Sequence, residues 1–328
     1  MVGADVGGAH GLPAHWRVFE GSVFFYSFEP HPASLERLKS HVAAGEYPEF
    51  YCVLGDALSG TGGPRTFYRT NEPTGSSILP PNKSVVGPYA AESYFFPCTE
   101  TTVETRRLED VLEERRETVL DLIKLDIQGA ELEVLQGLGE DRLNSLLVAE
   151  VEVGLHGAYV GQGGFGEIAA LMRQHGLDCY DVRVARTYLR RNGQIDGYQR
   201  EVFDVFANSP TVAARAWEFD VVFFRAMDKV LATGDAATVK KSIVAFCGYH
   251  YFAEGFELAE RAERLRIVSA AEAKHIKETI VAWHRDLSRR FYDAPRPLFE
   301  SIRRFLARRH WGQSSRWSQY LWTEYPNS

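Results

Sequence analysis

The sequence is poor in cysteine, and its few cysteines form no recognisable site. The 328 residues include four, Cys52, Cys98, Cys179 and Cys247, with no Cys-x-x-Cys pair and no Cys/His spacing typical of zinc ligands. Scattered cysteines of this kind argue against a structural metal and against a disulfide framework. We therefore expect reduced thiols and a cytoplasmic location.

Long apolar runs and an excess of positive charge are also missing. No uninterrupted apolar stretch approaches the roughly 18 residues that a membrane-spanning helix needs. The start, MVGADVGG, lacks the charged and apolar regions of a signal peptide. The formal net charge is −7, whereas a nucleic-acid binder needs basic residues that displace counterions from phosphates. We expect no signal peptide, no transmembrane segment and no nucleic-acid partner.

The sequence does contain an alternation of short apolar segments and helical patterns. The apolar segments are rich in Val, Ile, Phe and Leu, as strands buried on both faces of a sheet are. They lie at residues 2–6, 23–28, 49–54, 120–126, 146–151, 203–207 and 219–225. Helices are predicted to begin at Pro32 and to cover 130–138 and 165–175, the last ending at Gly176. This order favours an α/β fold, a parallel sheet with helices on its faces.

Two segments fall outside this alternation. Residues 59–97 are rich in Gly, Pro, Ser, Thr and Asn, which predicts a long loop, and long loops in compact domains are usually functional or disordered. After Met227 the predicted elements are all helical, at residues 236–246, 252–266, 270–289 and 297–309. We therefore predict an α/β domain over residues 1–227 and a helical C-terminal extension over residues 228–328.

A glycine-rich turn follows the first predicted strand. Residues 5–11 read Asp-Val-Gly-Gly-Ala-His-Gly and lead into a predicted helix. Glycine is needed where the backbone closely approaches a ligand or where φ is positive, and amides at a helix start can hold a polar or anionic group. Such a turn also occurs for purely structural reasons, so it does not identify a ligand site by itself.

An acidic residue at the tip of the second strand strengthens the case for a ligand. Glu29 follows Gly11 by 18 positions, close to the spacing at which a carboxylate accepts hydrogen bonds from both ribose hydroxyls. A helix cap or a solvated side chain is the alternative for Glu29. The glycines do not have the Gly-x-Gly-x-x-Gly spacing of a nicotinamide site, so S-adenosylmethionine, which has adenine and ribose but no pyrophosphate, fits better. A nicotinamide-dependent oxidoreductase is kept as the alternative.

The most specific pattern covers residues 121–137. It reads Asp-Leu-Ile-Lys-Leu-Asp-Ile-Gln-Gly-Ala-Glu-Leu-Glu-Val-Leu-Gln-Gly, an apolar strand that ends at Asp126 and then a helix. This segment resembles the signature of the FkbM methyltransferase family, in which an Ile-Lys-Leu/Ile-Asp strand leads into Glu-Gly-Ala-Glu and a Leu-rich helix. The glycine turn, the Phe-Glu-Pro segment, a Leu-Glu-Asp-Val-Leu helix at 108–112 and a Glu-Val-Glu strand at 150–152 follow the family's order. The resemblance covers residues 2–226.

The resemblance implies a Rossmann-like class I methyltransferase sheet, S-adenosylmethionine as methyl donor, and O-methylation of a hydroxyl on a sugar, glycoconjugate or secondary metabolite, for example in polysaccharide biosynthesis. Carried over by position, the cofactor site would consist of Asp5, Gly7, Gly8, His10, Gly11, Glu29, Asp56, Ala57 and Asp126. Glu29 would bind ribose, Asp56 would lie beside adenine, and Asp126 would face the reactive centre. Two positions depart from the family pattern, because Gly8 replaces an alanine and Gln128 stands where the family often has glutamate.

Methyl transfer to a hydroxyl needs a group that takes the hydroxyl proton. Asp126, at a strand end, is the first candidate for this base. His156, in the loop after the Glu-Val-Glu strand, is the second, because imidazole titrates in the right range. The structural alternatives are a helix-capping carboxylate and a loop histidine without a role. A metal-assisted variant with Asp126, Glu150 and Glu152 is a further interpretation, although we predict no metal site.

The C-terminal part is basic. Residues 285–316 hold nine arginines and three acidic residues. A helix docked on the domain with its arginines in water is the simpler interpretation, and peripheral contact with an anionic partner such as a membrane surface is the other. Nearby aromatic residues would suit sugar stacking, a homo-oligomer interface or ordinary packing. A non-catalytic module that kept the fold and binds a partner here is a third kind of function, and it predicts weak cofactor binding.

Overall fold

The computed structural model describes residues 1–9, 11–45, 51–188, 190 and 215–293. The chain divides into two compact units, Met1–Val268 and Ser269–Ser328, and the described part of the second is helix α11 (Ala270–Asp293). Several predicted features lie outside the described residues: His10, the strand at 203–207, the helix at 297–309 and most of the basic C-terminal segment. None of the described helices is long and apolar enough to cross a membrane.

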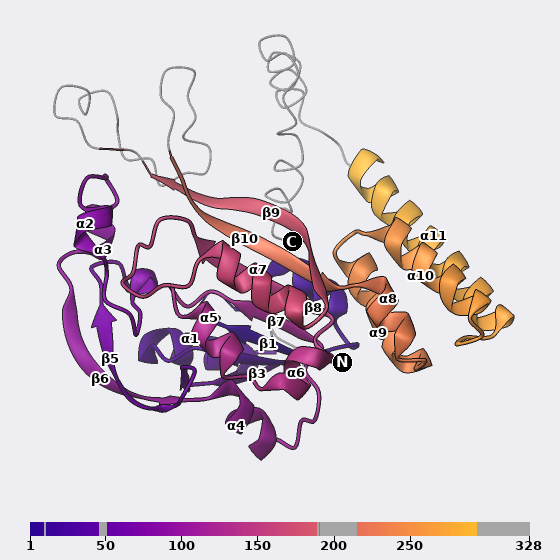
Figure 1. The fold of residues 1–328 in the computed structure, drawn as a ribbon, viewed down its shortest axis with the longest axis horizontal. Coiled ribbons are helices and arrows are strands. Elements are labelled where there is room, and N and C mark those ends of the chain that lie inside the picture. Colours follow the sequence, from indigo (N-terminus) through magenta and orange to yellow (C-terminus); the bar gives the residue numbers. More distant parts are fainter. Residues whose placement is uncertain (10, 46–50, 189, 191–214, 294–328) are drawn as a thin grey trace, which may run out of the picture. The chain divides into compact units, whose positions relative to one another are not determined.

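The first unit is built on a seven-stranded sheet (Figure 1). Its strands are β1 (Val2–Val6), β2 (Phe24–Phe28), β3 (Tyr51–Leu54), β7 (Leu122–Leu125), β8 (Val148–Gly154), β9 (Leu177–Tyr188) and β10 (Arg215–Arg225). The order is β3-β2-β1-β7-β8-β10-β9, and neighbours pair in parallel except β10, which runs antiparallel to β8 and β9. The predicted α/β fold with a mostly parallel, Rossmann-like sheet is therefore confirmed.

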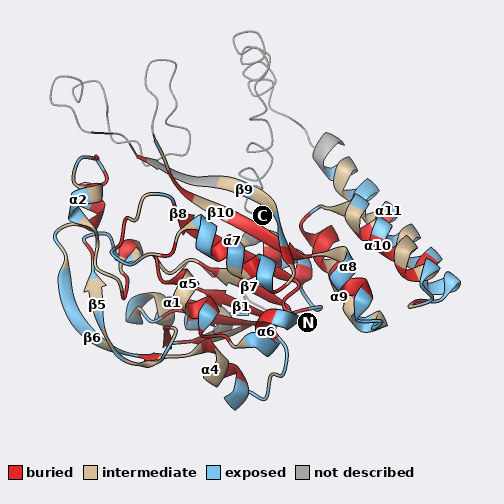
Figure 2. Ribbon diagram, viewed as in Figure 1, coloured by how far each residue is buried: buried red, intermediate tan, exposed pale blue. Residues whose placement is uncertain are grey.

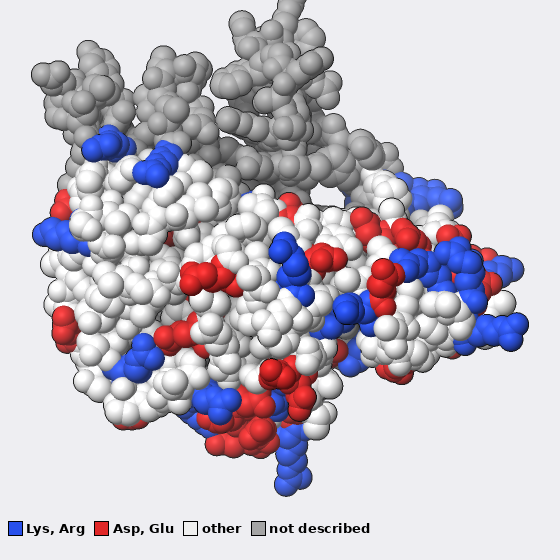
Figure 3. Space-filling view, viewed as in Figure 1, with Lys and Arg blue, Asp and Glu red and all other residues white. Residues whose placement is uncertain are grey.

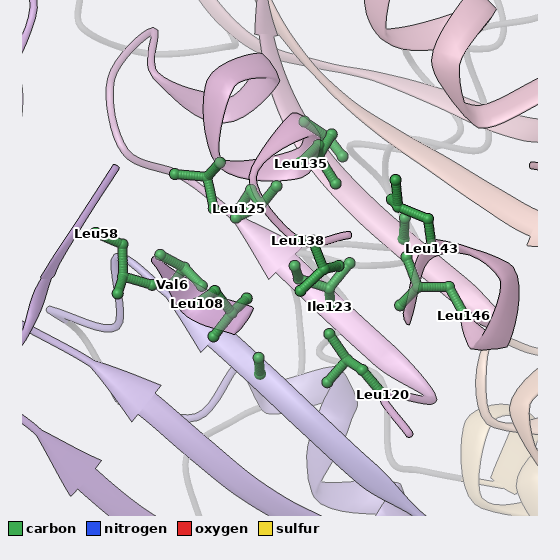
Figure 4. Close-up of a cluster of buried hydrophobic side chains, with 14 of the residues drawn as sticks. Val6, Leu58, Leu108, Leu120, Ile123, Leu125, Leu135, Leu138, Leu143 and Leu146 are labelled. Atoms are coloured by element: carbon green, nitrogen blue, oxygen red, sulfur yellow. The ribbon is translucent and has the colours of Figure 1, made fainter. Parts of the chain in front are cut away.

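The largest apolar core lies on one face of this sheet. Four helices cover it, α4 (Leu108–Glu114), α5 (Glu131–Gln136), α6 (Glu140–Ser145) and α7 (Phe165–Gln174). Ile123 and Leu125 belong to this core, whereas Lys124 points to the other face because side chains alternate along a strand. Leu108 and Leu135 of the helices join the same core (Figure 4). Burying each such side chain stabilises the fold by about 1.5–3 kcal/mol.

Further helices of the first unit are η1 (Ala14–Phe19), α1 (Pro32–Ala43), α8 (Met227–Ala232), α9 (Ala236–Gly248) and α10 (Phe252–Arg264). Aromatic contacts attach two of them to the second face of the sheet. Trp16 of η1 stacks on Phe25 of β2 with ring centroids 5.1 Å apart, and Phe246 of α9 stacks on Phe224 of β10 at 4.6 Å. Figure 2 shows the strands between the helix layers as largely buried. The prediction of helices on both faces is therefore confirmed.

The region after β10 is helical in the described residues, as predicted. The helices α9, α10 and α11 cover the segments predicted at 236–246, 252–266 and 270–289. The change from strands to helices falls at Met227, where the domain boundary was predicted, whereas the first compact unit continues through α10 to Val268.

The prediction of one long loop over residues 59–97 is wrong. Strand β5 (Gly63–Arg69) lies within it and pairs antiparallel with β6 (Thr99–Arg106), which also pairs with β4 (Ala57–Leu58). The segment further contains η2 (Pro73–Gly75), α2 (Lys83–Val86) and α3 (Glu92–Phe95). The Gly- and Pro-rich composition hid a strand whose partner lies far along the chain, and such long-range pairing leaves little local signal.

Candidate cofactor and active site

A cavity lies at the carboxyl ends of four neighbouring strands. The loop after each strand contributes to its lining: Gly7 and Ala9 after β1, Glu29 to His31 after β2, Asp56 to Leu58 after β3, and Asp126 to Gln128 after β7. Phe67 of β5 and residues 76–78 form another part of the wall. Ligands of open α/β sheets bind in the crevice outside the carboxyl ends of the strands. The segment predicted as a loop therefore contributes a wall to this crevice.

The glycine turn is shaped by close contacts within the protein. Gly7 has a φ of +91°, and a Cβ added there would lie 1.9 Å from the Asp126 carbonyl oxygen. A Cβ on Gly8 would lie 2.1 Å from Ser27 Oγ. The Gly11 amide donates to the Gly8 carbonyl, 2.8 Å away, and Gly11 also has a positive φ, +80°. Tight packing between the ends of β1, β2 and β7 therefore requires these glycines, and only Gly7 of the three lines the cavity. The helix after the turn, η1, is a 3-10 helix that starts at Ala14.

Two buried oxygens beneath the turn, Asp5 Oδ2 and Ser27 Oγ, have no hydrogen-bond partner among the described residues. Burial raises the pKa of Asp5 to about 6, although the ammonium of Lys124 lowers it. A buried polar atom without a partner costs about 1–3 kcal/mol, more when it is charged. A cofactor that brings donors or positive charge to this side of the turn would offset that cost, and S-adenosylmethionine carries both an ammonium and a sulfonium.

Glu29 occupies the predicted ribose position at the tip of β2. It lines the cavity, and its Oε1 accepts a hydrogen bond from the His31 amide at 2.7 Å. Burial raises the pKa of Glu29, while the His31 amide and the Arg37 guanidinium lower it. No donor among the described residues bonds its second carboxylate oxygen. Glu29 can therefore accept further hydrogen bonds from a ligand in the cavity.

Replacing Glu29 with alanine is expected to weaken S-adenosylmethionine binding by about 10- to 100-fold, because a hydrogen bond to a charged group contributes about 1.5–3 kcal/mol. Isothermal titration of the purified variant would measure this change. The matched control is Glu36→Ala, which removes an exposed carboxylate of α1 whose ion pair among the described residues is with Lys39. Equal affinities of the Glu29 variant and the wild type would refute the ribose role.

The predicted adenine residues lie after β3. Asp56, Ala57 and Leu58 all line the cavity, and the last two are buried at the start of the small sheet. The Asp56 carboxylate pairs with the Arg106 guanidinium, with 3.4 Å between Oδ1 and Nη1. The cavity thus has an apolar wall at Ala57 and Leu58 beside a carboxylate, which suits a heterocycle that carries an amino group.

Asp126 stands at the end of β7 in a set of polar contacts. Its Oδ1 accepts a hydrogen bond from Gln128 Nε2 at 2.9 Å, and its Oδ2 lies 3.4 Å from the Lys124 ammonium. Burial lowers the pKa of Lys124, but the carboxylates of Asp126, Asp5 and Glu150 outweigh this and the net shift is upward. Lys124 therefore stays charged and stabilises the Asp126 carboxylate.

Gln128 connects this aspartate to two further residues. Its Nε2 also donates to Glu152 Oε2 at 3.0 Å, and its Oε1 lies 3.1 Å from the hydroxyl of Tyr159. The same hydroxyl lies 2.7 Å from the Gly75 carbonyl. A glutamate at position 128 would place a third carboxylate beside those of Asp126 and Glu152. The amide of glutamine instead donates hydrogen bonds to both. The sequence marked Gln128 as a departure from the family but gave no sign of this bridging role.

Glu131 holds the loop that carries Asp126 and Gln128. Its Oε1 accepts hydrogen bonds from the amides of Ile127 and Gly129, at 3.0 and 3.1 Å. Burial raises the pKa of Glu131 to about 7, although its hydrogen bonds with backbone amides lower it. Gln128 has a φ of +60° and Gly129 a φ of +103°, and this left-handed turn depends on the Glu131 carboxylate. We therefore assign Glu131 a structural role in this loop.

His156 lies away from the cavity. It follows β8 at the predicted edge of the sheet, but it lines a separate pocket with Tyr89, Arg215 and Trp217. Its Nε2 lies 3.0 Å from the Ala216 carbonyl and its Nδ1 lies 3.2 Å from Arg215 Nη2. The structure therefore brings Asp126 together with the cofactor residues and does not bring His156 to them.

The carboxylates considered for a metal-assisted mechanism form hydrogen bonds with other side chains. Glu152 accepts from Gln128, and Glu150 Oε2 lies 2.9 Å from His15 Nε2 and accepts from the Tyr249 hydroxyl at 2.8 Å. Within the part of the chain that the structure describes, no group of three or more His, Cys, Asp or Glu is arranged to hold a metal ion.

Comparisons with known proteins identify the family. The Methyltransferase FkbM domain family matches residues 2–179. Methyltransferase sdnD of Sordaria araneosa is 29% identical over 170 residues, and the match covers 46% of this chain and 63% of that protein. This chain thus spans less than two thirds of that relative.

The similarity of this chain to solved structures is low. A TehB-like SAM-dependent methyltransferase from Corynebacterium glutamicum gives a TM-score of 0.28 at 13% identity, covering 69% of this chain and 80% of that one. A putative sarcosine dimethylglycine methyltransferase from Galdieria sulphuraria gives 0.28 at 9% identity, covering 86% and 71%. Scores this low carry no argument, so the assignment depends on the family match. The chain belongs to the FkbM methyltransferase family, whose methyl donor is S-adenosylmethionine.

Proposed function

We propose that this chain transfers the methyl group of S-adenosylmethionine to a hydroxyl oxygen of a small molecule such as a sugar, a glycoconjugate or a secondary metabolite. The observation that carries the proposal is the position of Asp126. It lines the same cavity as Glu29 and the glycine turn, at the carboxyl edge of the sheet. A fixed carboxylate at this place is the group that a hydroxyl acceptor needs and that a more nucleophilic acceptor does not.

The chain's own residues would hold the cofactor along the strand ends. Glu29 would accept hydrogen bonds from the ribose, and Asp56 with Ala57 would contact the adenine. Asp5 and the turn at Gly7, Gly8 and Gly11 would lie near the amino-acid portion. When bound, S-adenosylmethionine supplies an activated methyl group on a sulfonium. The protein mainly has to position the two reactants, which lowers the barrier by removing the entropy cost of their encounter.

Asp126 would take the acceptor's proton. The Lys124 ammonium lies 3.4 Å from one of the Asp126 carboxylate oxygens, and Gln128 donates a hydrogen bond to the other at 2.9 Å. The acceptor oxygen would lose its proton to Asp126 as it forms its bond to the methyl carbon, the carbon–sulfur bond would break with its electron pair left on sulfur, and the neutral acid would then release the proton to solvent. Such general-base assistance typically contributes 10²–10⁴-fold to the rate.

The base role of His156 stays a prediction, and its contacts favour Asp126 instead. Burial lowers the pKa of His156, the Arg215 guanidinium lowers it further, and the Ala216 carbonyl raises it. A neutral imidazole has one acceptor nitrogen. With Nε2–H donating to the Ala216 carbonyl, that acceptor is Nδ1, which receives the Arg215 hydrogen bond. No lone pair is left for an acceptor proton.

The test is a transfer assay with S-adenosylmethionine labelled at its methyl carbon. The acceptors are paired compounds of the same skeleton that carry either a hydroxyl or an amine. We expect the labelled methyl carbon in a methyl ether, with one S-adenosylhomocysteine formed per ether. Nuclear magnetic resonance would show whether that carbon is bonded to oxygen or to nitrogen. Transfer to the amines but not to the hydroxyls would refute O-methylation while leaving the methyltransferase assignment intact.

A further inference from the structure

A second pocket lies beside the proposed active site and has no part in the reaction described so far. Its volume is about 320 Å³, which is within the range of small-molecule pockets. It is lined by Ser84, Val85, Pro88, Tyr89, His156, Arg190, Arg215 and Trp217. Two arginines and an imidazole therefore surround a partly aromatic hollow.

Arg215 is the best-placed cation of this pocket. Its Nη1 donates to the Tyr89 hydroxyl at 3.0 Å, and its Nη2 approaches His156 Nδ1 at 3.2 Å. Neither partner is a carboxylate, so they orient the guanidinium without cancelling its charge. An arginine has five N–H donors, and among the described residues these two contacts leave three for a ligand.

The other walls keep that guanidinium in place. Trp217 is buried, and the rings of Tyr89 and His156 pack edge-on against it with centroids 4.7 and 5.1 Å away. Arg190 pairs through its backbone with Tyr89, across an isolated antiparallel bridge. Side chains fixed in this way bind a ligand without a large loss of conformational entropy.

The charged side chains among the described lining residues are basic. Among the described residues that line the pocket none is acidic, and neither Arg190 nor Arg215 forms an ion pair with a described carboxylate. The face drawn in Figure 3, in contrast, mixes acidic and basic side chains. Two guanidinium groups without a carboxylate partner among the described residues favour carboxylate or phosphate at this hollow, because the oxygens of these anions match the geometry of the guanidinium fork.

One continuous segment joins this pocket to the cofactor cavity. Residues 76–78 line the cavity, and Ser84 to Tyr89 line the pocket. Between them, the Asn82 amide donates to the Ala158 carbonyl at 2.7 Å. The next residue, Tyr159, packs in one apolar cluster with Tyr89 and Trp217, and its hydroxyl reaches Gln128 beside Asp126. The segment at residues 76–89 therefore contributes to the linings of both the cavity and the pocket.

We propose that this pocket binds a carboxylate or phosphate group of the methyl acceptor, with Arg215 as its principal ligand and Tyr89 beside the attached carbon skeleton. The acceptor is then an anionic molecule with its reacting hydroxyl away from its charged end. His156 orients Arg215 and is a positioning residue. The acceptor part of this inference rests on the proposed function, whereas anion binding by the pocket does not.

Isothermal titration of the full chain, without S-adenosylmethionine, tests the pocket directly. The probes are phenyl phosphate and benzoate, which distinguish phosphate from carboxylate, and the neutral phenyl β-glucoside is the comparison. We expect at least one anion to bind and the glucoside not to bind. Arg215→Gln should weaken anion binding about tenfold or more, because a charge-assisted hydrogen bond is lost. Arg215→Lys, which keeps the charge, should retain part of the affinity.

The matched control is Arg264→Gln, at an exposed position at the end of α10. It should bind the anions as the wild type does. The proposal is overturned if neither anion binds the wild type, or if the Arg215 and Arg264 variants lose affinity equally, since that indicates general surface attraction. Anion binding without any methyl transfer would instead contradict the proposed function and leave the pocket intact.

Discussion

Replacing Asp126 with asparagine is expected to lower kcat for methyl transfer by about 10²–10⁴-fold, the usual contribution of a general base. An amide of the same shape keeps the loop's geometry but cannot take a proton. Asp126 lies beside Lys124 and Gln128 rather than against the predicted ribose and adenine residues. The dissociation constant of S-adenosylmethionine should therefore change by less than about tenfold. Single-turnover kinetics together with isothermal titration would separate the two quantities.

The matched control is Asp110→Asn, a half-exposed aspartate of α4 that pairs with Arg107. It should leave kcat unchanged. If Asp126 only supports the start of α5, the asparagine variant will retain its rate, because asparagine caps helices as well as aspartate does. An unchanged kcat in a folded Asp126 variant would therefore remove the base assignment and favour the structural interpretation.

Replacing Glu150 with alanine is expected to lower the free energy of unfolding by about 3–5 kcal/mol, as breaking a buried ion pair does. Glu150 is 4% exposed, and it is paired in register with Lys124 on the neighbouring strand. Its Oε2 is bonded by His15 and by the hydroxyl of Tyr249. In the alanine variant, Lys124, His15 and Tyr249 would lose their contact with the Glu150 carboxylate. Urea unfolding followed by circular dichroism would measure the loss.

The pH dependence of this effect has a definite sign. Burial raises the pKa of Glu150, but His15, Lys124 and Tyr249 outweigh it and bring the pKa to about 2, from 4.5. Because the folded pKa is the lower one, the stabilisation is fully present above about pH 4.5 and is lost as the pH falls toward 2. The difference in stability between the wild type and Glu150→Ala should therefore shrink over that range.

A variant that keeps the shape serves as the control for Glu150. Glu150→Gln retains an acceptor for Tyr249 but not the charge, so it should lose less stability than the alanine variant and lose the pH dependence as well. Asp5 acts in the opposite sense, since its pKa is raised to about 6 and its ionisation destabilises the fold as the pH rises. A stability gap that stays constant from pH 5 to about 2 would contradict the role of Glu150.

The sequence predicted the elements whose signal is local. Strand β1 was predicted with its observed bounds, and α7 ends at the turn before Gly176, whose φ is +78°. Apolar runs and capping residues depend on neighbours a few positions away, so they are visible in a short window. The family signature around Asp126 was visible for the same reason, because a strand, a turn and a helix lie within 17 consecutive residues.

Only the tertiary structure decided which side chains meet. Strand β5 was missed because its partner β6 begins about 30 residues later along the chain. Gln128 contacts Glu152 and Tyr159, and no local pattern predicts that an amide will bridge these groups.

The second pocket is a further case of this kind. It combines Tyr89, His156 and Arg215 from three distant segments. The sequence by itself determined the class of fold, the family and the residues at the strand ends, because those depend on periodicity and on a contiguous motif. The partners of each charged side chain depend on strand register and loop closure, which are set by packing across the whole sheet.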